Sequence, residues 1–257
     1  MLKISNLRLA YADRIIFDNE DILVRPGDKV GLVGPNGAGK TSLFRVIAGE
    51  EKPDSGTIFV DPSITIGYFS QDVGQMAGRT ALQEVLAGAG RVWELGKKLG
   101  ELEHRMSDPS GPGLTDAEME AYGDIQLEFT HLGGYDLETR AETILSGLGL
   151  GKERQGEAVE SFSGGWKMRI ALARILLLEP GLLLMDEPTN HLDLESILWL
   201  EAWLKAFKGE LVMTSHDREF MTRVCGRTIE VASGAITTYS GDYDFYMRER
   251  VLRRDQL

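Results

Sequence analysis

The sequence predicts an α/β fold: a mostly parallel sheet with helices on both faces, an antiparallel β flank, and a helical subdomain with a helical-hairpin insertion. Three observations predict it. Apolar runs of buried-strand length occur at residues 29–34 and 182–187, with helical patterns between and after them, as expected for parallel strands covered on both faces. Residues 3–10 alternate between apolar and polar side chains, which is typical of a flanking strand. Two helical stripes lie between residues 92 and 132.

The remaining strands are expected in the last fifth of the chain. Residues 211–215 form a third apolar run that can join the parallel sheet. Residues 228–232 and 235–239 are separated only by Ser233 and Gly234, which is the pattern of a β-hairpin.

The middle of the chain is expected to form a helical hairpin over residues 92–132. The first stripe has apolar side chains at helical spacing: Val92, Leu95, Leu99, Leu102 and Met106. A Pro- and Gly-rich loop then breaks the helix at residues 107–113. Thr115 and Glu118 form a capping box that opens the second helix. The second stripe ends at Gly133: Met119, Tyr122, Ile125, Phe129 and Leu132. Ordinary packing inside a helical subdomain is the alternative interpretation.

Composition narrows the classes of protein that remain. The chain has 257 residues, 42% of them hydrophobic, without an apolar run of eighteen residues or the apolar stretch of a signal peptide. Cys225 is the only cysteine, so an internal disulfide is impossible and a small buried side chain is expected. Together these features predict a cytoplasmic protein without membrane insertion.

The charge distribution is uneven. The net charge is −12, which makes direct DNA binding unexpected. Residues 93–142 hold twelve acidic and four basic side chains, so most of the acidic excess lies in the middle segment. The end of the chain is basic, with Arg248, Arg250, Arg253 and Arg254.

A phosphate-binding loop follows the first apolar run. Eight residues match the pattern G-x-x-x-x-G-K-[ST] in full, and a ninth begins the helical stretch after it: Gly34, Pro35, Asn36, Gly37, Ala38, Gly39, Lys40, Thr41 and Ser42. Such a loop directs backbone N–H groups at phosphates, and the helix N-terminus adds partial positive charge. Lys40 is expected to reach the β- and γ-phosphates of a nucleotide, and the Thr41 hydroxyl to ligate Mg²⁺.

The apolar run at 182–187 ends in two carboxylates. Asp186 is expected to hold the magnesium shell. Glu187 lies one residue further and is expected to orient and deprotonate the attacking water, a step worth about 10²–10⁴ in rate. An apolar strand that ends in acidic residues is common, and it is the P-loop beside it that turns this pattern into a prediction of ATP hydrolysis.

A third motif carries a resemblance to a known family. Residues 161–166 read Ser-Phe-Ser-Gly-Gly-Trp and resemble the Leu-Ser-Gly-Gly-Gln signature of ATP-binding-cassette (ABC) proteins. In that family the signature serves the nucleotide held by an opposing cassette. The resemblance implies that Ser163, Gly164 and Gly165 contact the ATP of a second cassette, in tandem or in a second copy. Phe162 and Trp166 depart from the usual Leu and Gln, and neither departure removes a group that faces phosphate.

Other family positions follow in the same order. The resemblance implies that Gln71 contacts Mg²⁺ and the attacking water, and that His216 hydrogen-bonds the γ-phosphate. Tyr11 lies where an aromatic ring stacks on adenine, although core packing of a tyrosine at a strand end is the alternative. Residues 190–193, Asn-His-Leu-Asp, resemble the loop that in this family contacts the other cassette.

Several features resemble the first cassette of an ABC-F protein, a tandem-cassette ATPase that acts on the ribosome. They are the Asn-His pair at residues 190–191, the run at 163–169, the hairpin at 92–132 and the basic helix after the aromatic residues at 239–246. The resemblance implies a nucleotide-binding domain over 1–246, an arm-like insertion at 92–132 and the start of a linker helix at 247–257. Hydrolysis by one isolated cassette is expected to be weak. The alternatives are the ATPase subunit of a membrane transporter and the head of a chromosome-maintenance protein.

Overall fold

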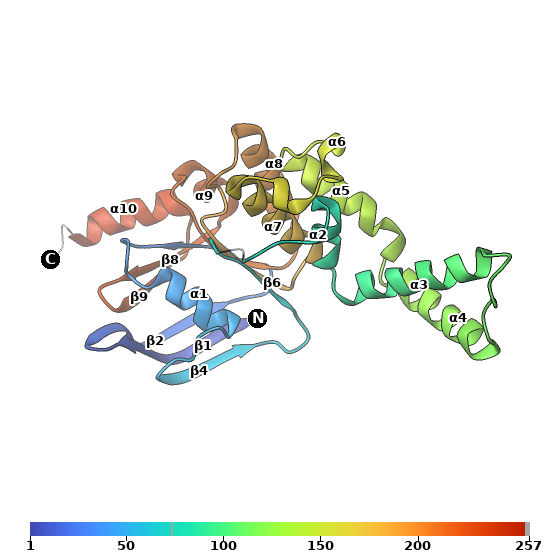
Figure 1. Cartoon of the computed structure of the whole chain (residues 1–257). Coiled ribbons are helices and arrows are strands. Elements are labelled where there is room, and N and C mark those ends of the chain that lie inside the picture. The colour runs from blue at the N-terminus through green and yellow to red at the C-terminus, as the bar shows by residue number, and fades with distance from the viewer. Residues whose placement is uncertain (73, 255–257) are drawn as a thin grey trace. The chain divides into compact units, whose positions relative to one another are not determined.

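The computed structural model describes residues 1–72 and 74–254, which form two compact units. Residues 1–72 and 179–254 make up the first, called here the sheet unit. Residues 74–178 make up the second, called the helical unit. Both are coloured along the chain in Figure 1.

The sheet unit contains a six-stranded sheet with strand order β5-β6-β7-β3-β8-β9. Its neighbours pair in parallel except β8 and β9, which pair antiparallel as a hairpin. The strands are β3 (Lys29–Val33), β5 (Ile66–Phe69), β6 (Leu182–Asp186), β7 (Glu210–Thr214), β8 (Arg227–Ala232) and β9 (Ala235–Tyr239). The predicted mostly parallel sheet and the C-terminal hairpin are confirmed, because apolar runs buried on both faces leave few alternatives to a central strand.

The predicted antiparallel flank is a separate three-stranded sheet with order β2-β1-β4. Its strands are β1 (Leu2–Tyr11), β2 (Arg14–Val24) and β4 (Ser55–Val60). This sheet explains the alternation of residues 3–10. Ile4, Leu7 and Leu9 are buried in the core, whereas the polar residues Asn6 and Arg8 that lie among them are exposed.

Helices cover both faces of the six-stranded sheet. The sheet unit holds α1 (Lys40–Ala48), α8 (Leu194–Ala206), α9 (Arg218–Val224) and α10 (Tyr243–Arg254). Val30 and Leu32 of β3 join the hydrophobic cluster that contains Phe44 of α1. Gly31 between them faces α9, where an added Cβ would lie 2.5 Å from Met221 Cε. Successive strand residues point to opposite faces, so α1 and α9 lie on opposite sides of the sheet.

The helical unit consists of helices and short 3₁₀ turns. They are α2 (Ala81–Ala87), α3 (Arg91–Ser107), α4 (Asp116–His131), η1 (Gly134–Asp136), α5 (Leu137–Gly147), α6 (Lys152–Gln155), η2 (Val159–Ser161) and α7 (Gly164–Leu178). In the described part of the chain, no helix combines the length and the apolarity that crossing a membrane requires.

The predicted helical hairpin is α3 and α4, which lie side by side in Figure 1. The Thr115–Glu118 capping box opens α4 as expected, and Gly133 follows its end with φ 68°. Arg91 pairs with Glu128 at 2.6 Å near one end, and Arg105 pairs with Glu118 at 2.6 Å near the other.

The predicted stripes are covered only in part. Leu95 and Leu99 of α3 are buried, whereas Met106 and Met119 toward the loop are 47% and 48% exposed. In a pair of helices, each helix covers only one face of the other. Toward the two ends of this pair, ion pairs join α3 to α4. The spacing of apolar residues therefore located the helices and overstated how deeply the outer residues are buried.

The last helix begins earlier than the predicted linker. α10 starts at Tyr243 and continues to Arg254, so the expected boundary between residues 246 and 247 lies inside one helix. Residues 255–257 of the predicted linker lie outside the described residues.

Candidate active site

The P-loop connects β3 to α1 within the sheet unit. Gly34 has φ 150°, and a Cβ there would lie 2.1 Å from the backbone oxygen of Val231. Gly39 has φ 108°, and a Cβ there would lie 2.3 Å from Ile16 Cγ2. Both positions therefore require glycine, because an added methyl would strain the backbone and also collide with a neighbouring strand.

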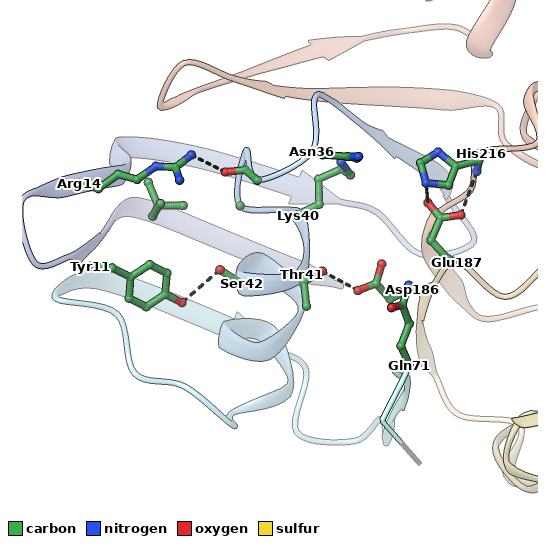
Figure 2. A pocket seen from close by; sticks show the side chains of 13 residues that line it. Tyr11, Arg14, Asn36, Lys40, Thr41, Ser42, Gln71, Asp186, Glu187 and His216 are labelled. Carbon is green, nitrogen blue, oxygen red and sulfur yellow. Dashed lines mark hydrogen bonds and ion pairs between the residues drawn. The ribbon is translucent and has the colours of Figure 1, made fainter. Parts of the chain in front are cut away.

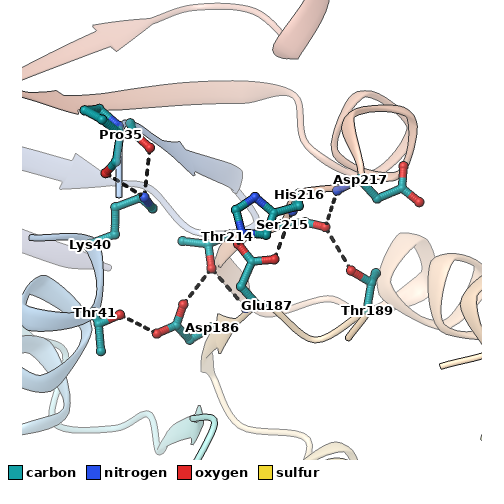
Figure 3. Close-up of polar contacts among 11 residues, drawn as sticks. Pro35, Lys40, Thr41, Asp186, Glu187, Thr189, Thr214, Ser215, His216 and Asp217 are labelled. Atoms are coloured by element: carbon teal, nitrogen blue, oxygen red, sulfur yellow. Dashed lines mark hydrogen bonds and ion pairs between the residues drawn. The ribbon is translucent and has the colours of Figure 1, made fainter. Parts of the chain in front are cut away.

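Lys40 is the first residue of α1, and its side chain folds back over the loop. Its Nζ donates hydrogen bonds to the carbonyl oxygens of Gly34 at 2.8 Å and Pro35 at 3.1 Å. Figure 3 shows the Lys40 side chain joined to the loop at Pro35 by these contacts. The positive charge is thus held next to the N–H groups that the P-loop offers to an anion.

Asp186 is the centre of a buried polar network. Its Oδ2 accepts a hydrogen bond from Thr41 Oγ1 at 2.6 Å, and its Oδ1 accepts one from Thr214 Oγ1 at 2.8 Å. Asp186 and Thr214 end the adjacent parallel strands β6 and β7, where they are paired in register. Sequence reasoning missed Thr214, although its place at the end of the third apolar run was a usable signal.

Glu187 occupies a constrained position immediately after β6. Its φ is 55°, a left-handed conformation that is uncommon outside glycine and is often found at functional sites. The backbone N–H donates to Thr214 Oγ1 at 3.0 Å, and Oε2 accepts from the backbone N–H of His216 at 2.9 Å. Burial raises the pKa of the Glu187 carboxyl, and the nearby His216 and Lys40 limit the rise. A buried carboxylate with a raised pKa is a stronger base than an exposed one.

His216 follows β7 and faces Glu187 from its exposed side. Its Nε2 lies 3.6 Å from Glu187 Oε1, and its side chain is 72% exposed. The loop around it is held by Ser215, whose hydroxyl lies 3.0 Å from Thr189 Oγ1 and accepts a 3.0 Å bond from the Asp217 N–H. Figure 3 shows this chain of contacts. His216 is therefore fixed at its backbone while its ring stays accessible.

A cavity of about 340 Å³ brings most of the predicted site together. All of its lining residues belong to the sheet unit: Tyr11, Arg14, Ile16, Asn36, Gly37, Gly39, Lys40, Thr41, Ser42, Gln71, Asp186, Glu187 and His216. Figure 2 shows Tyr11 and Arg14 on one side of the cavity, with Glu187 and His216 on the other. Gly34, Pro35 and Ala38 belong to the same loop without lining the cavity.

The Tyr11 side of the cavity includes a residue that sequence reasoning missed. The Tyr11 hydroxyl donates to Ser42 Oγ at 3.1 Å, and Arg14 Nη2 donates to the Gly37 carbonyl oxygen at 2.7 Å. Arg14 begins β2 directly after the turn that follows β1. It carries no motif, and only the fold places its charge beside the P-loop.

Gln71 lines this cavity and a second one of about 710 Å³. The two cavities share Tyr11, Thr41 and Asp186. Gln71 comes two residues after β5, which is the neighbour of β6 in the sheet. The side-chain oxygens of Thr41, Asp186 and Gln71 form a hard donor set of the kind that Mg²⁺ prefers. The predicted magnesium ligands thus fit that ion.

The signature residues belong to the helical unit. Ser163 precedes α7, and its carbonyl oxygen accepts the first helical bond, from the Lys167 N–H at 3.0 Å. Gly164 and Gly165 are the first two residues of the helix. An added Cβ on Gly164 would meet no atom within 4 Å, and its backbone has no positive φ. Packing against the described residues therefore does not account for glycine at this position.

Comparison with known families gives a match over residues 17–190 to the family described as ABC transporter. Curated relatives include the Energy-dependent translational throttle protein EttA of Mycobacterium tuberculosis, 35% identical over 247 residues, which is 96% of this chain and 43% of that protein. The probable ATP-binding protein YbiT of Escherichia coli O157:H7 is 30% identical over the whole chain and 47% of its own length. The chain thus spans less than half of these relatives.

Solved structures share the fold at lower identity. The ATP-binding subunit of an ABC transporter matches with a TM-score of 0.71 and 20% identity, covering 98% of this chain and 94% of that one. A dimeric structure of MJ0796, a bacterial ABC transporter cassette, matches with a TM-score of 0.65 and 21% identity over 93% of this chain and 98% of the other.

Proposed function

Because this chain belongs to the ABC transporter family, and within it to the ABC-F proteins that the sequence indicated, we propose that it is one of two cassettes that hydrolyse ATP between them to act on the ribosome. The chain is an ATP-binding cassette, and cassettes of this family hydrolyse ATP to ADP and phosphate. The observation that carries the hydrolytic part of the proposal is the network of Thr41, Asp186, Thr214, Glu187 and His216 beside the P-loop.

ATP is proposed to lie along the cavity with its base near Tyr11 and its γ-phosphate toward Glu187 and His216. This direction follows from the side chains, since Lys40 and the loop N–H groups lie between an aromatic side and a carboxylate side. Lys40 Nζ neutralises charge on the β- and γ-phosphates, and contacts with them replace its hydrogen bonds to the Gly34 and Pro35 carbonyl oxygens.

Thr41, Asp186 and Gln71 are proposed to hold Mg²⁺. The ion would neutralise phosphate charge when bound. The buried Asp186 carboxylate is oriented for that role by two hydroxyls, and Thr214 keeps its second oxygen satisfied. This support restricts the carboxylate to one orientation, as a preorganised site requires.

Glu187 is proposed as the general base. Its carboxylate is fixed by the His216 N–H, and its raised pKa favours taking a proton from water in line with the γ-phosphate. The exposed His216 ring can then donate a hydrogen bond to the γ-phosphate from the same side. Asp186 accepts hydrogen bonds from the Thr41 and Thr214 hydroxyls instead, and is proposed to keep a separate role.

Ser163, Gly164 and Gly165 are proposed to serve the ATP of the opposing cassette. The open space at Gly164 supports this, because glycine is a weaker helix former than alanine and no contact with the described residues requires it. A backbone that must approach a phosphate from outside the chain gives a reason for the missing side chain. The ATP bound by one isolated cassette has no signature from an opposing cassette beside it, so we expect weak ATP turnover.

The relatives and the helical hairpin support the proposed role on the ribosome. The name of EttA, a translational throttle protein, refers to translation. We propose that residues 92–132 act as an arm-like insertion and that α10 begins a linker to a second cassette in a cytoplasmic protein. The acidic excess of the hairpin favours contact with basic ribosomal protein over rRNA.

The test is co-sedimentation of the full-length protein with ribosomes, in ATP and Mg²⁺ and over a series of salt concentrations. The Glu187→Gln protein should bind ribosomes, and the Lys40→Ala protein should not, because it cannot form the ATP state. If the full-length Glu187→Gln protein does not associate at any salt concentration, the ribosomal role is wrong and a transporter subunit becomes the better proposal.

A further inference from the structure

The two departures from the usual signature contact the same cation. Phe162 and Trp166 stand immediately before and after Ser163–Gly165 in the sequence. The Arg154 guanidinium carbon lies 4.8 Å from the Phe162 ring centre and 5.2 Å from that of Trp166. Both distances are within the range of cation–π attraction. The two aromatic residues are therefore parts of one contact.

A second guanidinium extends the arrangement. The Arg169 guanidinium carbon lies 4.6 Å from the Trp166 ring centre. Trp166 thus contacts two arginines, and Arg154 contacts two rings. We call Phe162, Arg154, Trp166 and Arg169 the aromatic–arginine stack. Planar guanidinium groups suit such contacts better than ammonium groups do.

Both arginines are anchored to other parts of the helical unit. Arg154 in α6 donates to the Glu157 carboxylate from Nε at 3.1 Å and from Nη2 at 3.4 Å. Arg169 donates to the carbonyl oxygen of Leu148, just after α5, at 2.9 Å. Phe162 is buried. The stack therefore connects the start of α7 to α6 and to the end of α5.

The start of α7 has particular need of such support. It begins with two glycines, and glycine has more backbone freedom than any other residue, which makes it a poor helix former. The first turn also carries no acidic side chain to stabilise its N–H groups. An anion site at a helix N-terminus works only when those N–H groups are already aimed at the anion.

We propose that the aromatic–arginine stack holds the first turn of α7 in the orientation that receives the γ-phosphate of the opposing cassette, with Trp166 and Arg154 as positioning residues. This inference rests on the proposed two-cassette site. Charge alone does not explain the arrangement, because Glu157 compensates Arg154. The stack acts through the Ser163 hydroxyl and the N–H groups of the first turn.

The test compares two ATP affinities of the same chain. In the Glu187→Gln background, sedimentation velocity with ATP and Mg²⁺ measures self-association, and titration with ATP at low protein concentration measures binding at the chain's own P-loop. Trp166→Gln should weaken ATP-dependent association roughly tenfold, which corresponds to loss of cation–π contacts. Affinity at the chain's own P-loop should stay within about twofold, because the stack serves the partner's nucleotide.

Matched variants separate positioning from general loss of structure. Trp166→Phe keeps a ring and should retain most of the association. Arg154→Ala should match Trp166→Gln, and the double variant should be no weaker than either single one, as expected for members of one stack. Trp93→Gln is the control: Trp93 also contacts a cation, Lys97, at 5.9 Å, but it lies on the hairpin.

The results distinguish two kinds of failure. Equal association of the Trp166→Gln and Trp93→Gln proteins, with thermal stability unchanged in both, would overturn the role of the stack. So would an equal loss at the chain's own P-loop site. If the Glu187→Gln protein without other changes fails to associate in ATP, two copies of this chain do not form the proposed shared site, and the inference falls with that site.

Discussion

The P-loop and the signature are both glycine-rich turns before a helix, yet Gly34 of the first and Gly164 of the second have opposite surroundings. At Gly34 an added Cβ would lie 2.1 Å from the Val231 backbone oxygen, and φ is 150°. At Gly164 the same atom would meet nothing within 4 Å. The first glycine is explained by the chain's own packing. No described residue explains the second, which supports the proposal that the signature turn faces a partner, whereas the P-loop turn belongs to a pocket of this chain.

The largest expected effect separates chemistry from binding in the P-loop cavity. Glu187→Gln should reduce ATP turnover by about 10²–10⁴, because an amide cannot accept the proton from water. ATP affinity should be retained, since the amide oxygen can still accept the His216 N–H. Single-turnover hydrolysis and ATP titration measure the two quantities. Turnover at the wild-type rate would show that Glu187 is not the base.

Removing the P-loop cation should weaken binding itself. Lys40→Ala should lower ATP affinity by roughly 10- to 100-fold, in line with the ~1.5–3 kcal/mol of hydrogen bonds to charged groups. Isothermal titration calorimetry with ATP and Mg²⁺ gives the affinity. Lys52→Ala is the control, because Lys52 is exposed and does not line the cavity. An equal loss in both variants would exclude a specific role for Lys40.

A pair of glycine substitutions tests the comparison directly. Gly34→Ala should destabilise the fold by about 2–3 kcal/mol, through backbone strain and the contact with Val231. Gly164→Ala should leave stability unchanged or raise it by up to about 1 kcal/mol, while it weakens ATP-dependent association. Urea unfolding and sedimentation velocity supply the two readouts. Destabilisation by Gly164→Ala would mean that the signature turn is packed after all.

The smallest effect concerns pH. Burial raises the folded-state pKa of Glu187, and the base must be ionised, so the acidic limb of the single-turnover profile should lie above the ordinary glutamate range. His216, whose Nε2 lies 3.6 Å from the carboxylate, opposes that rise in the Glu187 pKa, so His216→Ala should move the limb to still higher pH.

The same shift affects folding stability. A raised folded pKa means that the stabilising contribution of protonated Glu187 is present at low pH and is lost as pH rises through the folded value. Glu187→Gln should flatten that part of the stability curve, which urea unfolding at several pH values measures. An acidic limb at the ordinary glutamate pKa would contradict the burial argument.

Local patterns in the sequence determined much of this protein. The P-loop and the Thr115–Glu118 capping box depend on residues a few positions apart. The apolar runs of β3, β6 and β7 predicted a parallel sheet, and a carboxylate after such a strand has a known place at the sheet edge. For these features backbone geometry follows directly from neighbouring residue types.

Tertiary structure decided what depends on distant segments. Arg14 reaches Gly37 across two elements, Thr214 supports Asp186 from an adjacent strand, and Phe162 meets Trp166 through Arg154. Arg14, Thr214 and Arg154 form no sequence motif with the residues that they contact, because side-chain contacts across a fold depend on strand order and helix packing. The nucleotide-binding loop could be recognised from its own residues, whereas the groups that orient its carboxylates and its signature turn could not.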